Sequence, residues 1–482
     1  MKRSLARHAA LFLAYGALGS LLTAVTLLVV TLESRPDLAP WHLAELDAEY
    51  TASSGVKSLR EYLALEQRLF EELEREVFAV TGPAAPYELN RYRRGSPSHP
   101  SRWPRDWNRT FELPADQPSA AVLLLHGLSD SPYSLRALGE RLHAGGAHVL
   151  GLRIPGHGTA PAGLVDVRWR DMAAAVALAV EDLAGRFPGV PLHLVGYSNG
   201  ATLALHTTLS ALEELGRPVP DRLVLIAPQI GVTRLAALAV WQARLGHWLG
   251  LEKLAWNELL QEYDPFKYGS FAVNAGDISH RVTAAIQRQL KRLGASGRLQ
   301  AVPPILAFSS VVDATVRAPD LVANLFNPLP PGPHQLVLFD INRRAAIEHL
   351  LKWRPDEWLA ALQGASGADF QLTVVTNDNP HSGEVVALRY GADGAVASRE
   401  PLGLSWPEGV YSLSHVALPF PESDPLYGGA PEPPSPGISL GNIAMHGERG
   451  VLQISDSAML RQRWNPFYPY QEQRILAFLG LD

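Results

Sequence analysis

A serine set between two glycines constrains the fold of this chain more than any other stretch. It lies in the sequence VGYSNGA at residues 195–201, which follows a mostly apolar run and precedes a run with a helical pattern. Side chains at Gly196 and Gly200 would collide with a strand and a helix that met at Ser198, so the glycines suit the tight corner called a nucleophile elbow. Glycine and serine are also common in loops, so an ordinary turn stays open on this stretch alone.

Apolar runs and helical patterns alternate on both sides of this corner. The apolar runs predict strands at residues 120–125, 148–152, 192–195, 223–227, 303–309 and 334–339. Strands that alternate with helices form a mostly parallel sheet with helices on both faces. The sequence therefore predicts an α/β fold, whose core has a first part at residues 115–228 and a second part at residues 301–482.

Two segments interrupt this alternation. Residues 229–300 are rich in Leu, Ala and Trp at helical spacing and contain no clear strand, which predicts a helical cap over a site. Extra helices packed into the core would have the same pattern, so both interpretations stay open. Residues 324–407 hold a helical pattern at 345–362 and strand-like runs at 371–376 and 385–390, and they are predicted to form an insertion within the second part of the core.

The N-terminal segment predicts a membrane anchor. Residues 9–32 carry no charged side chain, and as a helix this run would span a hydrocarbon core of about 30 Å. Lys2, Arg3 and Arg7 precede it, and the positive-inside rule then places residues 1–8 in the cytoplasm. A cleaved signal peptide is the alternative, but its apolar part is usually shorter and ends in an A-x-A-like site, which is missing here. We therefore expect a transmembrane helix at residues 9–32.

Residues 33–114 are predicted to form a membrane-proximal helix and a basic loop. Apolar residues recur at helical spacing over residues 56–80, with many Glu and Arg between them. Six arginines follow between residues 91 and 109, in a loop that also contains Pro and Ser. Such a run could contact anionic lipid headgroups or be a solvated connection, and the second is the commoner case.

Composition and missing motifs exclude several kinds of site. The chain has no cysteine, which excludes disulfides, thiolate zinc sites and a thiol nucleophile. A net charge of −6 gives no general basic footprint for nucleic acid. The sequence contains no H-E-x-x-H, no G-x-x-x-x-G-K-[ST] loop and no G-x-G-x-x-G fingerprint. We therefore expect no metal, no cofactor and no nucleic-acid partner.

A serine hydroxyl needs partners before it acts as a nucleophile. It needs a base within hydrogen-bond reach, a carboxylate that orients the base, and two donors for the developing oxyanion. After an elbow, the acid and then the histidine follow the serine along the chain. Asp313 follows an apolar strand and His415 follows the strand-like run 409–414, so these residues are the first candidates. The alternatives that stay open are Asp340 and Asp320 for the acid, and His381 and His446 for the base.

Two backbone N–H groups are the candidates for the oxyanion hole. One belongs to Asn199, directly after the serine, and the other to Leu128, in the loop after the predicted strand at 120–125. The dipeptide His126-Gly127 before Leu128 is also typical of a tight turn that ends a strand. Gly127 lets the backbone turn inward in either case.

Several short segments of the chain form a set. They are LLHGL at 124–128, LRIPGHGT at 152–159, GYSNG at 196–200, DATV at 313–316, SHV at 414–416 and DPLYG at 424–428. The first four resemble motifs of the α/β-hydrolase superfamily, and more narrowly of its serine-aminopeptidase and monoacylglycerol-lipase-like branch. The last two resemble the histidine loop of bacterial membrane-anchored members. The long spacing between Asp313 and His415 departs from simple members, in which one strand separates the two residues.

The resemblance implies the α/β-hydrolase fold and a serine hydrolase of carboxylesterase or lipase type. It implies that Ser198, Asp313 and His415 form a triad that cleaves carboxylic esters, lipid esters among them, through an acyl-enzyme. The Trp- and Leu-rich segment predicted as a cap and the predicted membrane anchor favour a small acyl substrate of apolar character. The resemblance also implies a single-pass protein of the bacterial inner membrane, with its catalytic domain facing the periplasm.

Two other functions stay open. A serine aminopeptidase or thioesterase would use the same fold, and acids of the predicted cap could receive a substrate amine: Glu252, Glu258, Glu262 and Asp264. A catalytically silent binding or scaffold module is the alternative from another class, since a fold does not fix a function. Against that module, the residue types of the triad and both oxyanion loops occur in the expected order.

Overall fold

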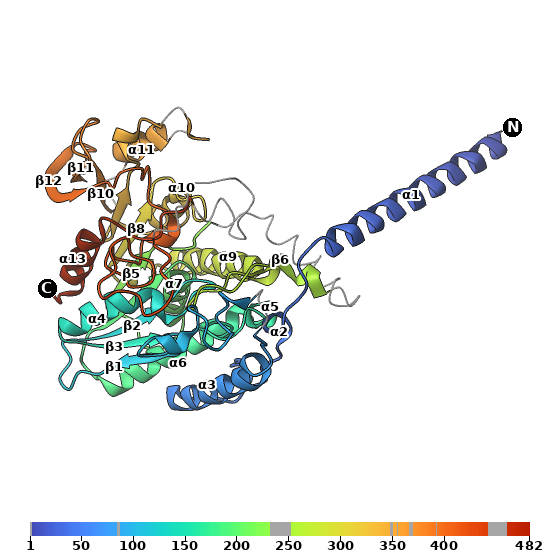
Figure 1. Ribbon diagram of the computed structural model, residues 1–482. Helices are drawn as coiled ribbons and strands as arrows, with labels where there is room; N and C mark the ends of the chain where they lie inside the picture. The colour runs from blue at the N-terminus through green and yellow to red at the C-terminus, as the bar shows by residue number, and fades with distance from the viewer. Residues whose placement is uncertain are drawn as a thin grey trace.

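A ten-stranded sheet forms the centre of the molecule in the computed structural model (Figure 1). Its strand order is β1-β3-β2-β4-β5-β8-β9-β10-β11-β12. Neighbouring strands are parallel from β3 through to β10, whereas β1, β11 and β12 join antiparallel. The structure describes residues 2–83, 87–231, 252–347, 350–353, 355–365, 370–391, 393–441 and 460–482.

The strands β2, β3, β4 and β8 are buried along their whole length. The bounds of the strands of the sheet are β1 (Phe111–Leu113), β2 (Ala120–Leu125), β3 (Ala147–Leu152), β4 (Leu192–Tyr197), β5 (Arg222–Ile226), β8 (Ile305–Ser310), β9 (Gln335–Phe339), β10 (Gln371–Asn377), β11 (Glu384–Tyr390) and β12 (Val396–Ser405). A separate pair is formed by β6 (Trp256–Glu258) and β7 (Phe271–Ala272).

Helices cover both faces of the sheet, because alternate side chains of each strand point to opposite faces. In β2, Leu123 and Leu125 belong to one apolar cluster, whereas Val122 and Leu124 belong to another. The first cluster includes α6 (Trp169–Arg186), α7 (Asn199–Glu213) and α9 (Val273–Ala295). The second includes α4 (Arg136–Ala144) and α13 (Tyr468–Leu479). The predicted α/β fold, with a mostly parallel sheet between layers of helices, is confirmed.

The segment predicted as a cap is only partly described. Its α9 packs against α7, and Ile278, Val282 and Ile286 are buried in the cluster that α7 shares with the sheet. This is the alternative interpretation, extra helices packed into the core. Residues 232–251, which include Trp241 and Trp248, lie outside the described residues, so the cap is not confirmed.

The insertion predicted at residues 324–407 widens the sheet. It supplies β10, β11 and β12 beyond β9. The helix predicted at 345–362 was placed wrongly: α11 runs from Pro355 to Ala365, and a short 3₁₀ turn, Arg343–Ala345, precedes it. A proline favours the first turn of a helix, because its missing N–H has no intrahelical acceptor to lose there.

Residues between the N-terminal helix and the sheet pack against the body of the molecule. α3 (Leu59–Leu73) buries Tyr62, Leu65 and Leu69 in the cluster that contains α6. It continues as a π-helical turn, Glu74–Phe78. Arg91 of the predicted basic loop is buried as well, and its Nη2 atom donates to Oδ1 of Asn108, 2.8 Å away. This arginine is therefore part of the packed structure and not of a solvated loop.

The N-terminal helix α1 (Lys2–Glu33) projects away from the body (Figure 1). It contains the segment 9–32, and many of the large apolar side chains described along it are exposed, among them Phe12, Leu13 and Leu22. Of the helices within the described residues, none combines the length and apolar content needed to cross a membrane. Side chains at several α1 positions, such as 21, 24, 25 and 28, are not among those described. The helix is thus found, and the predicted membrane anchor is not confirmed.

Candidate active site

Ser198 occupies a strained corner between β4 and α7. Its backbone angles are φ 53° and ψ −115°, a combination that residues with a side chain rarely adopt. A Cβ atom at Gly196 would lie 2.4 Å from the backbone of Ala201, and one at Gly200 would lie 2.0 Å from the carbonyl oxygen of Leu125. Close packing of strand, corner and helix therefore leaves no room for a side chain at either glycine.

Hydrogen bonds from neighbouring strands hold this corner in place. The N–H of Ser198 donates to the carbonyl of Ile226 at the end of β5, 2.9 Å away. The carbonyl of Ser198 accepts from the N–H of Gln229 and from the hydroxyl of Thr202, each 3.2 Å away. These contacts over-determine the backbone, which is how a strained conformation persists in a folded protein.

The parallel strands bring three chain segments to one edge of the sheet. β2, β4 and β8 run in the same direction, so the loops that follow them emerge together. The loop after β2 carries Leu128, the corner after β4 carries Ser198, and the turn after β8 carries Asp313. Segments that are far apart in the sequence therefore become neighbours in space.

Three side chains form a hydrogen-bonded chain at this edge. The Nδ1 atom of His415 lies 2.8 Å from Oδ2 of Asp313, and its Nε2 atom lies 2.9 Å from Oγ of Ser198. All three residues are buried. His415 begins a short 3₁₀ turn, His415–Ala417, and its imidazole lies beside the ring of Tyr197, with centroids 5.5 Å apart. The imidazole is therefore in reach of a hydroxyl on one side and of a carboxylate on the other.

The surroundings of Asp313 keep its carboxyl group ionised. Burial acts to raise its pKa, but the neighbouring His415 and two backbone N–H groups outweigh burial, so the pKa lies below its ordinary value. Those N–H groups belong to Thr315 and Val316, and they donate to Oδ1 over 2.8 and 2.9 Å. With Oδ1 occupied in this way, Oδ2 is left to accept from Nδ1–H of His415.

Two hydrogen bonds of Asn342 hold together the ends of the long segment between Asp313 and His415. The N–H of Asn342, just after β9, donates to the carbonyl of Tyr411 over 2.8 Å, and its Nδ2 atom donates to the carbonyl of Val410 over 2.8 Å. The strands β10 to β12 lie between these contacts along the chain. The chain therefore leaves after β9, adds three strands, and returns to the same place before it reaches His415.

The two N–H groups predicted for an oxyanion hole lie at the same sheet edge as Ser198. Asn199 is the first residue of α7, where N–H groups have no acceptor within the helix and the helix dipole favours a negative charge. Leu128 lies three residues beyond Leu125, which pairs in register with Gly196. Ser129 has φ 64° and turns the chain directly after Leu128.

Two residues that sequence reasoning missed hold the turn after Leu128. Nζ of Lys267 lies 2.8 Å from Oδ1 of Asp130, and the N–H of Tyr268 donates to the carbonyl of Ser129 over 2.9 Å. The Tyr268 hydroxyl accepts from the N–H of Thr159, 2.8 Å away. No local pattern signals these contacts, because they join segments that only the tertiary fold brings together.

The competing candidates lie elsewhere. Asp340 forms a bidentate ion pair with Arg343, at 2.8 Å for each contact, and accepts from the hydroxyl of Thr376. Asp320 lies on the short helix α10 (Ala318–Leu321), and His381 is exposed in a turn of the insertion. His446 lies outside the described residues. Of the candidate acids and bases that are described, the structure brings only Asp313 and His415 to Ser198.

In the part of the chain that the structure describes, no group of three or more His, Cys, Asp or Glu side chains could hold a metal ion.

Comparison with known proteins gives a family match for the part of the chain that contains Ser198. Residues 116–295 match the family model described as serine aminopeptidase, S33. No curated protein matches the chain.

Solved structures that resemble the chain are distant. A structure of the metagenome-derived lipolytic enzymes LipS and LipT is 19% identical with a TM-score of 0.37, over 53% of this chain and 98% of that chain. For the monoacylglycerol lipase of Paleococcus ferrophilus the identity is 17% and the TM-score 0.36, over 48% and 89%. For a monoglyceride lipase of Saccharomyces cerevisiae they are 15% and 0.37, over 48% and 82%. At these values the likenesses carry no argument about function.

The family match is the finding that decides the enzyme class. It spans β2, the serine corner and α9, and it agrees with the resemblance of the segments at 124–128, 152–159 and 196–200 to the serine-aminopeptidase branch. The segments at 313–316, 414–416 and 424–428 lie outside the match. Residues 116–295, which include Ser198, are similar to the serine aminopeptidase family, and the protein is a serine hydrolase.

Proposed function

We propose that this protein hydrolyses carboxylic esters with a catalytic triad of Ser198, His415 and Asp313. The observation that carries the proposal is the imidazole of His415, which lies within hydrogen-bond distance of both other side chains. A serine hydroxyl becomes a competent nucleophile when a base of this kind can remove its proton. An ionised carboxylate on the far side of the imidazole stabilises the imidazolium that results.

The geometry supports a two-step reaction. His415 takes the Oγ proton as Ser198 attacks the ester carbonyl, and then gives that proton to the departing alkoxide. Water next attacks the acyl-enzyme, with His415 again acting as base, and the carboxylic acid is released. Asp313 keeps the proton of Nδ1 on the side away from Ser198, so Nε2 remains free to accept.

Two backbone donors would stabilise the oxyanion of each tetrahedral intermediate. We assign them to the N–H groups of Leu128 and Asn199. Donors of this kind act mainly in the transition state, and removal of one typically lowers kcat by about 10²- to 10³-fold. The dipole of α7 adds to their effect, because its positive end points at the developing charge.

An ester suits the described residues better than the N-terminus of a peptide. A peptidase of this kind would need acids that receive the substrate amine, but Glu262 and Asp264 are buried and already used. Glu262 accepts from the N–H groups of Gly269 and Ser270, each 2.8 Å away, and Asp264 accepts from the hydroxyl of Tyr427 over 2.6 Å. Glu252 and Glu258 are exposed. Two of the four acids considered are therefore already engaged by partners within the protein.

The test is the loss of one hydroxyl. Ser198→Ala should abolish both labelling by a fluorophosphonate probe and turnover of short-chain aryl esters. Ser210→Ala, on the same helix α7, is the matched control and should retain both activities. Undiminished ester turnover by correctly folded Ser198→Ala would refute the proposal. Failure of the wild-type protein to react with the probe would favour a silent binding module.

The substrate class needs a second measurement on the same protein. Turnover of matched ester, thioester and aminoacyl-amide substrates would separate an esterase from a thioesterase and an aminopeptidase. A series of acyl chain lengths would then test the proposed preference for an apolar acyl group. Faster cleavage of aminoacyl amides than of esters would overturn the ester assignment.

We also propose that α1 anchors the protein in a bacterial inner membrane, with the hydrolase body facing the periplasm. The exposed apolar side chains of α1 and the basic residues Lys2, Arg3 and Arg7 before its apolar run support this orientation. A reporter fused after Asp482 should be active outside the cytoplasm. Activity inside the cytoplasm would contradict the orientation, and release of the protein by alkaline carbonate would contradict the anchor.

A further inference from the structure

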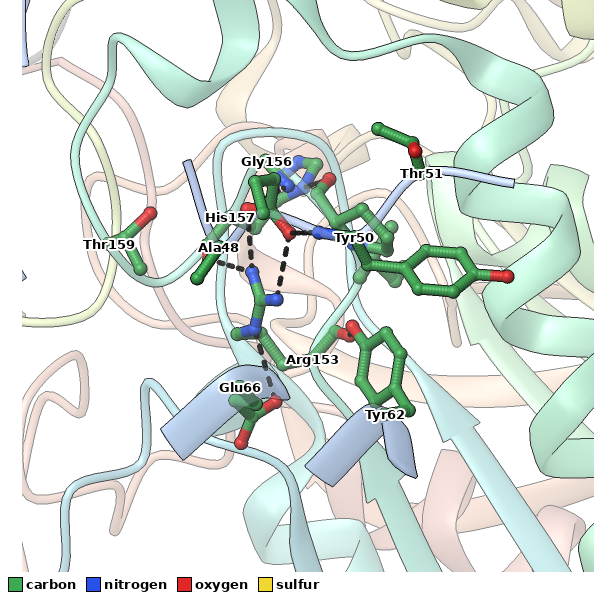
Figure 2. Close-up of polar contacts among 12 residues, drawn as sticks. Ala48, Tyr50, Thr51, Tyr62, Glu66, Arg153, Gly156, His157 and Thr159 are labelled. Carbon is green, nitrogen blue, oxygen red and sulfur yellow. Dashed lines mark hydrogen bonds and ion pairs between the residues drawn. The ribbon is translucent and has the colours of Figure 1, made fainter. Parts of the chain in front are cut away.

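A buried arginine joins the N-terminal part of the chain to the edge of the sheet that carries the site. Arg153 directly follows β3 and is almost fully buried. Its guanidinium contacts both carboxylate oxygens of Glu49, at 2.9 and 3.0 Å, and Oε2 of Glu66, at 3.1 Å. Figure 2 shows the guanidinium above Glu66, with Tyr62 beside it. Both glutamates lie outside the residues 116–295 that the family model matches.

The loop after β3 is held through this arginine and its partners. Nη1 of Arg153 also donates to the carbonyl of His157 over 3.0 Å, and the N–H of Gly156 donates to Oε2 of Glu49 over 2.9 Å. The hydroxyl of Tyr62 donates to the carbonyl of Arg153 over 2.6 Å. The planar fork of a guanidinium suits such a set of directed contacts, which the single ammonium of a lysine would not reproduce.

The next residue of this loop contacts the histidine that begins the oxyanion turn. The N–H of Ile154 donates to Nε2 of His126, 3.0 Å away. The Nδ1 atom of His126 lies 2.9 Å from the carbonyl oxygen of Gly127, and a carbonyl only accepts, so Nδ1 carries the proton. Burial holds the pKa of His126 well below its ordinary value, which agrees with a neutral ring that has one donor and one acceptor.

We propose that Glu49 and Glu66 are positioning residues for the hydrolase reaction, which act through Arg153 and His126 on the backbone that presents the Leu128 N–H. The sequence of contacts runs from the carboxylates to the guanidinium, from Arg153 to its neighbour Ile154, and from Ile154 to His126. His126 is two residues from Leu128. The N-terminal segment is therefore a working part of the site, which the family core alone does not supply. This inference rests on the ester hydrolysis proposed above.

A buried ion pair can add little net stability, so enzyme kinetics, and not stability, tests the positioning role. In Glu49→Gln the side chain keeps its shape but loses its charge, so its hydrogen bonds with the guanidinium of Arg153 and the N–H of Gly156 become weaker. We expect kcat for a short-chain aryl ester to fall about ten- to hundredfold, with KM changed less than about twofold, because oxyanion contacts are made mainly in the transition state. The rate of reaction with a fluorophosphonate should fall in parallel.

The matched control lies at the other end of the same strand. Glu112 accepts from Nε2 of His148, 2.5 Å away. His148 lies at the start of β3, whereas Arg153 follows the end of the same strand. Glu49→Gln and Glu112→Gln should both lower the melting temperature, but Glu112→Gln should leave kcat within about twofold of wild type. An equal loss of kcat in both variants would reduce the carboxylates to a general role in stability and would overturn the proposal.

Variants of His126 test the middle of the path. His126→Gln keeps an acceptor that can reach the N–H of Ile154 and should retain more kcat than His126→Leu, which removes it. The double variant Glu49→Gln/His126→Leu should be no slower than His126→Leu alone, because both changes break one path. Strictly additive losses would overturn the proposal. If Glu49→Gln fails to fold, Glu66→Gln takes its place. Ester turnover by wild type alongside unchanged kcat in these variants refutes the positioning role, whereas no turnover by wild type refutes the proposed function instead.

Discussion

The N–H of Asn342 donates to the carbonyl oxygen of Tyr411 over 2.8 Å, which joins the two ends of a long insertion. The insertion widens the sheet by β10, β11 and β12. Only three residues separate Tyr411 from His415. The contact therefore sets where the chain resumes after the insertion, and so where the proposed base stands relative to Ser198.

Asn342→Ala tests this closure. The side chain donates to the carbonyl of Val410, and its Oδ1 accepts from the N–H of Arg344 and from Nδ2 of Asn377. Since the residue is buried, its loss should lower the free energy of unfolding by about 1–3 kcal/mol. It should also lower kcat, because the loop that carries His415 keeps the backbone bond at Tyr411 but loses the side-chain bond at Val410. Urea unfolding and ester kinetics measure the two effects. Asn379→Ala, in an exposed turn of the same insertion, is the control and should change neither.

The glycines of the serine corner make a second prediction, on packing. A Cβ atom at Gly200 would lie 2.0 Å from a backbone oxygen of β2, which cannot move aside as a flexible side chain could. Gly200→Ala should therefore destabilise the protein by at least about 3 kcal/mol, or prevent folding. At Gly185, near the end of α6, a Cβ atom meets nothing within 4 Å. Gly185→Ala should be neutral or stabilising by up to about 1 kcal/mol, since alanine favours a helix. Similar melting temperatures for the two variants would contradict this account.

The strands that were predicted correctly share a simple property. β2, β4, β5, β8 and β9 are buried on both faces, so their residues form continuous apolar runs that can be read directly. β12 was missed for the opposite reason. It is mostly exposed and contains Arg399, Glu400 and Pro401, which leave no apolar pattern. A strand that is specified only by pairing with its neighbour has no signal of its own in the sequence.

The candidate site divides in the same way. The order of motifs along the chain predicted Ser198, Asp313 and His415 as the triad, and the structure brings these three side chains together. No pattern pointed to Glu49 or Lys267, because each acts through a contact with a distant segment. The alternative acid Asp340 also ends an apolar strand. What separates the two acids is their partners in the fold: Asp340 pairs with Arg343, whereas Asp313 contacts His415. Such contacts depend on the tertiary fold and not on local composition.

The orientation of one carboxyl group predicts the effect of Asp313→Asn. Oδ1 of Asp313 accepts from two backbone N–H groups, so the oxygen of an asparagine would take that place and its NH₂ group would face His415. Nδ1 of His415 would then have to accept, which moves the ring proton to Nε2 and blocks removal of the serine proton. We expect kcat to fall about 10⁴-fold with little change in stability. Asp340→Asn should leave kcat within about threefold and mainly lower stability. A larger loss of kcat in Asp340→Asn than in Asp313→Asn would reverse the assignment of the acid.

The buried histidine His42 predicts how stability depends on pH. Its Nδ1 atom accepts from the N–H of Ala39 over 3.0 Å, and its Nε2 atom lies 2.9 Å from the hydroxyl of Ser270. Burial lowers the pKa of His42 from 6.5 to about 4. A neutral ring is therefore favoured in the folded state, and this contribution is fully present above about pH 6.5 and is lost as the pH falls towards 4.

His42→Asn keeps an acceptor near the position of Nδ1 and removes the titrating ring. Between pH 6.5 and 4 the free energy of unfolding should then fall less steeply, by up to about 1.4 kcal/mol per pH unit, because one proton fewer is taken up on unfolding. Asn379→Ala, at an exposed turn, removes no titrating group and should leave the slope unchanged. Urea unfolding at half-unit intervals of pH measures the slopes. Parallel curves for wild type and His42→Asn would show that the ring of His42 takes up its proton equally well in the folded protein.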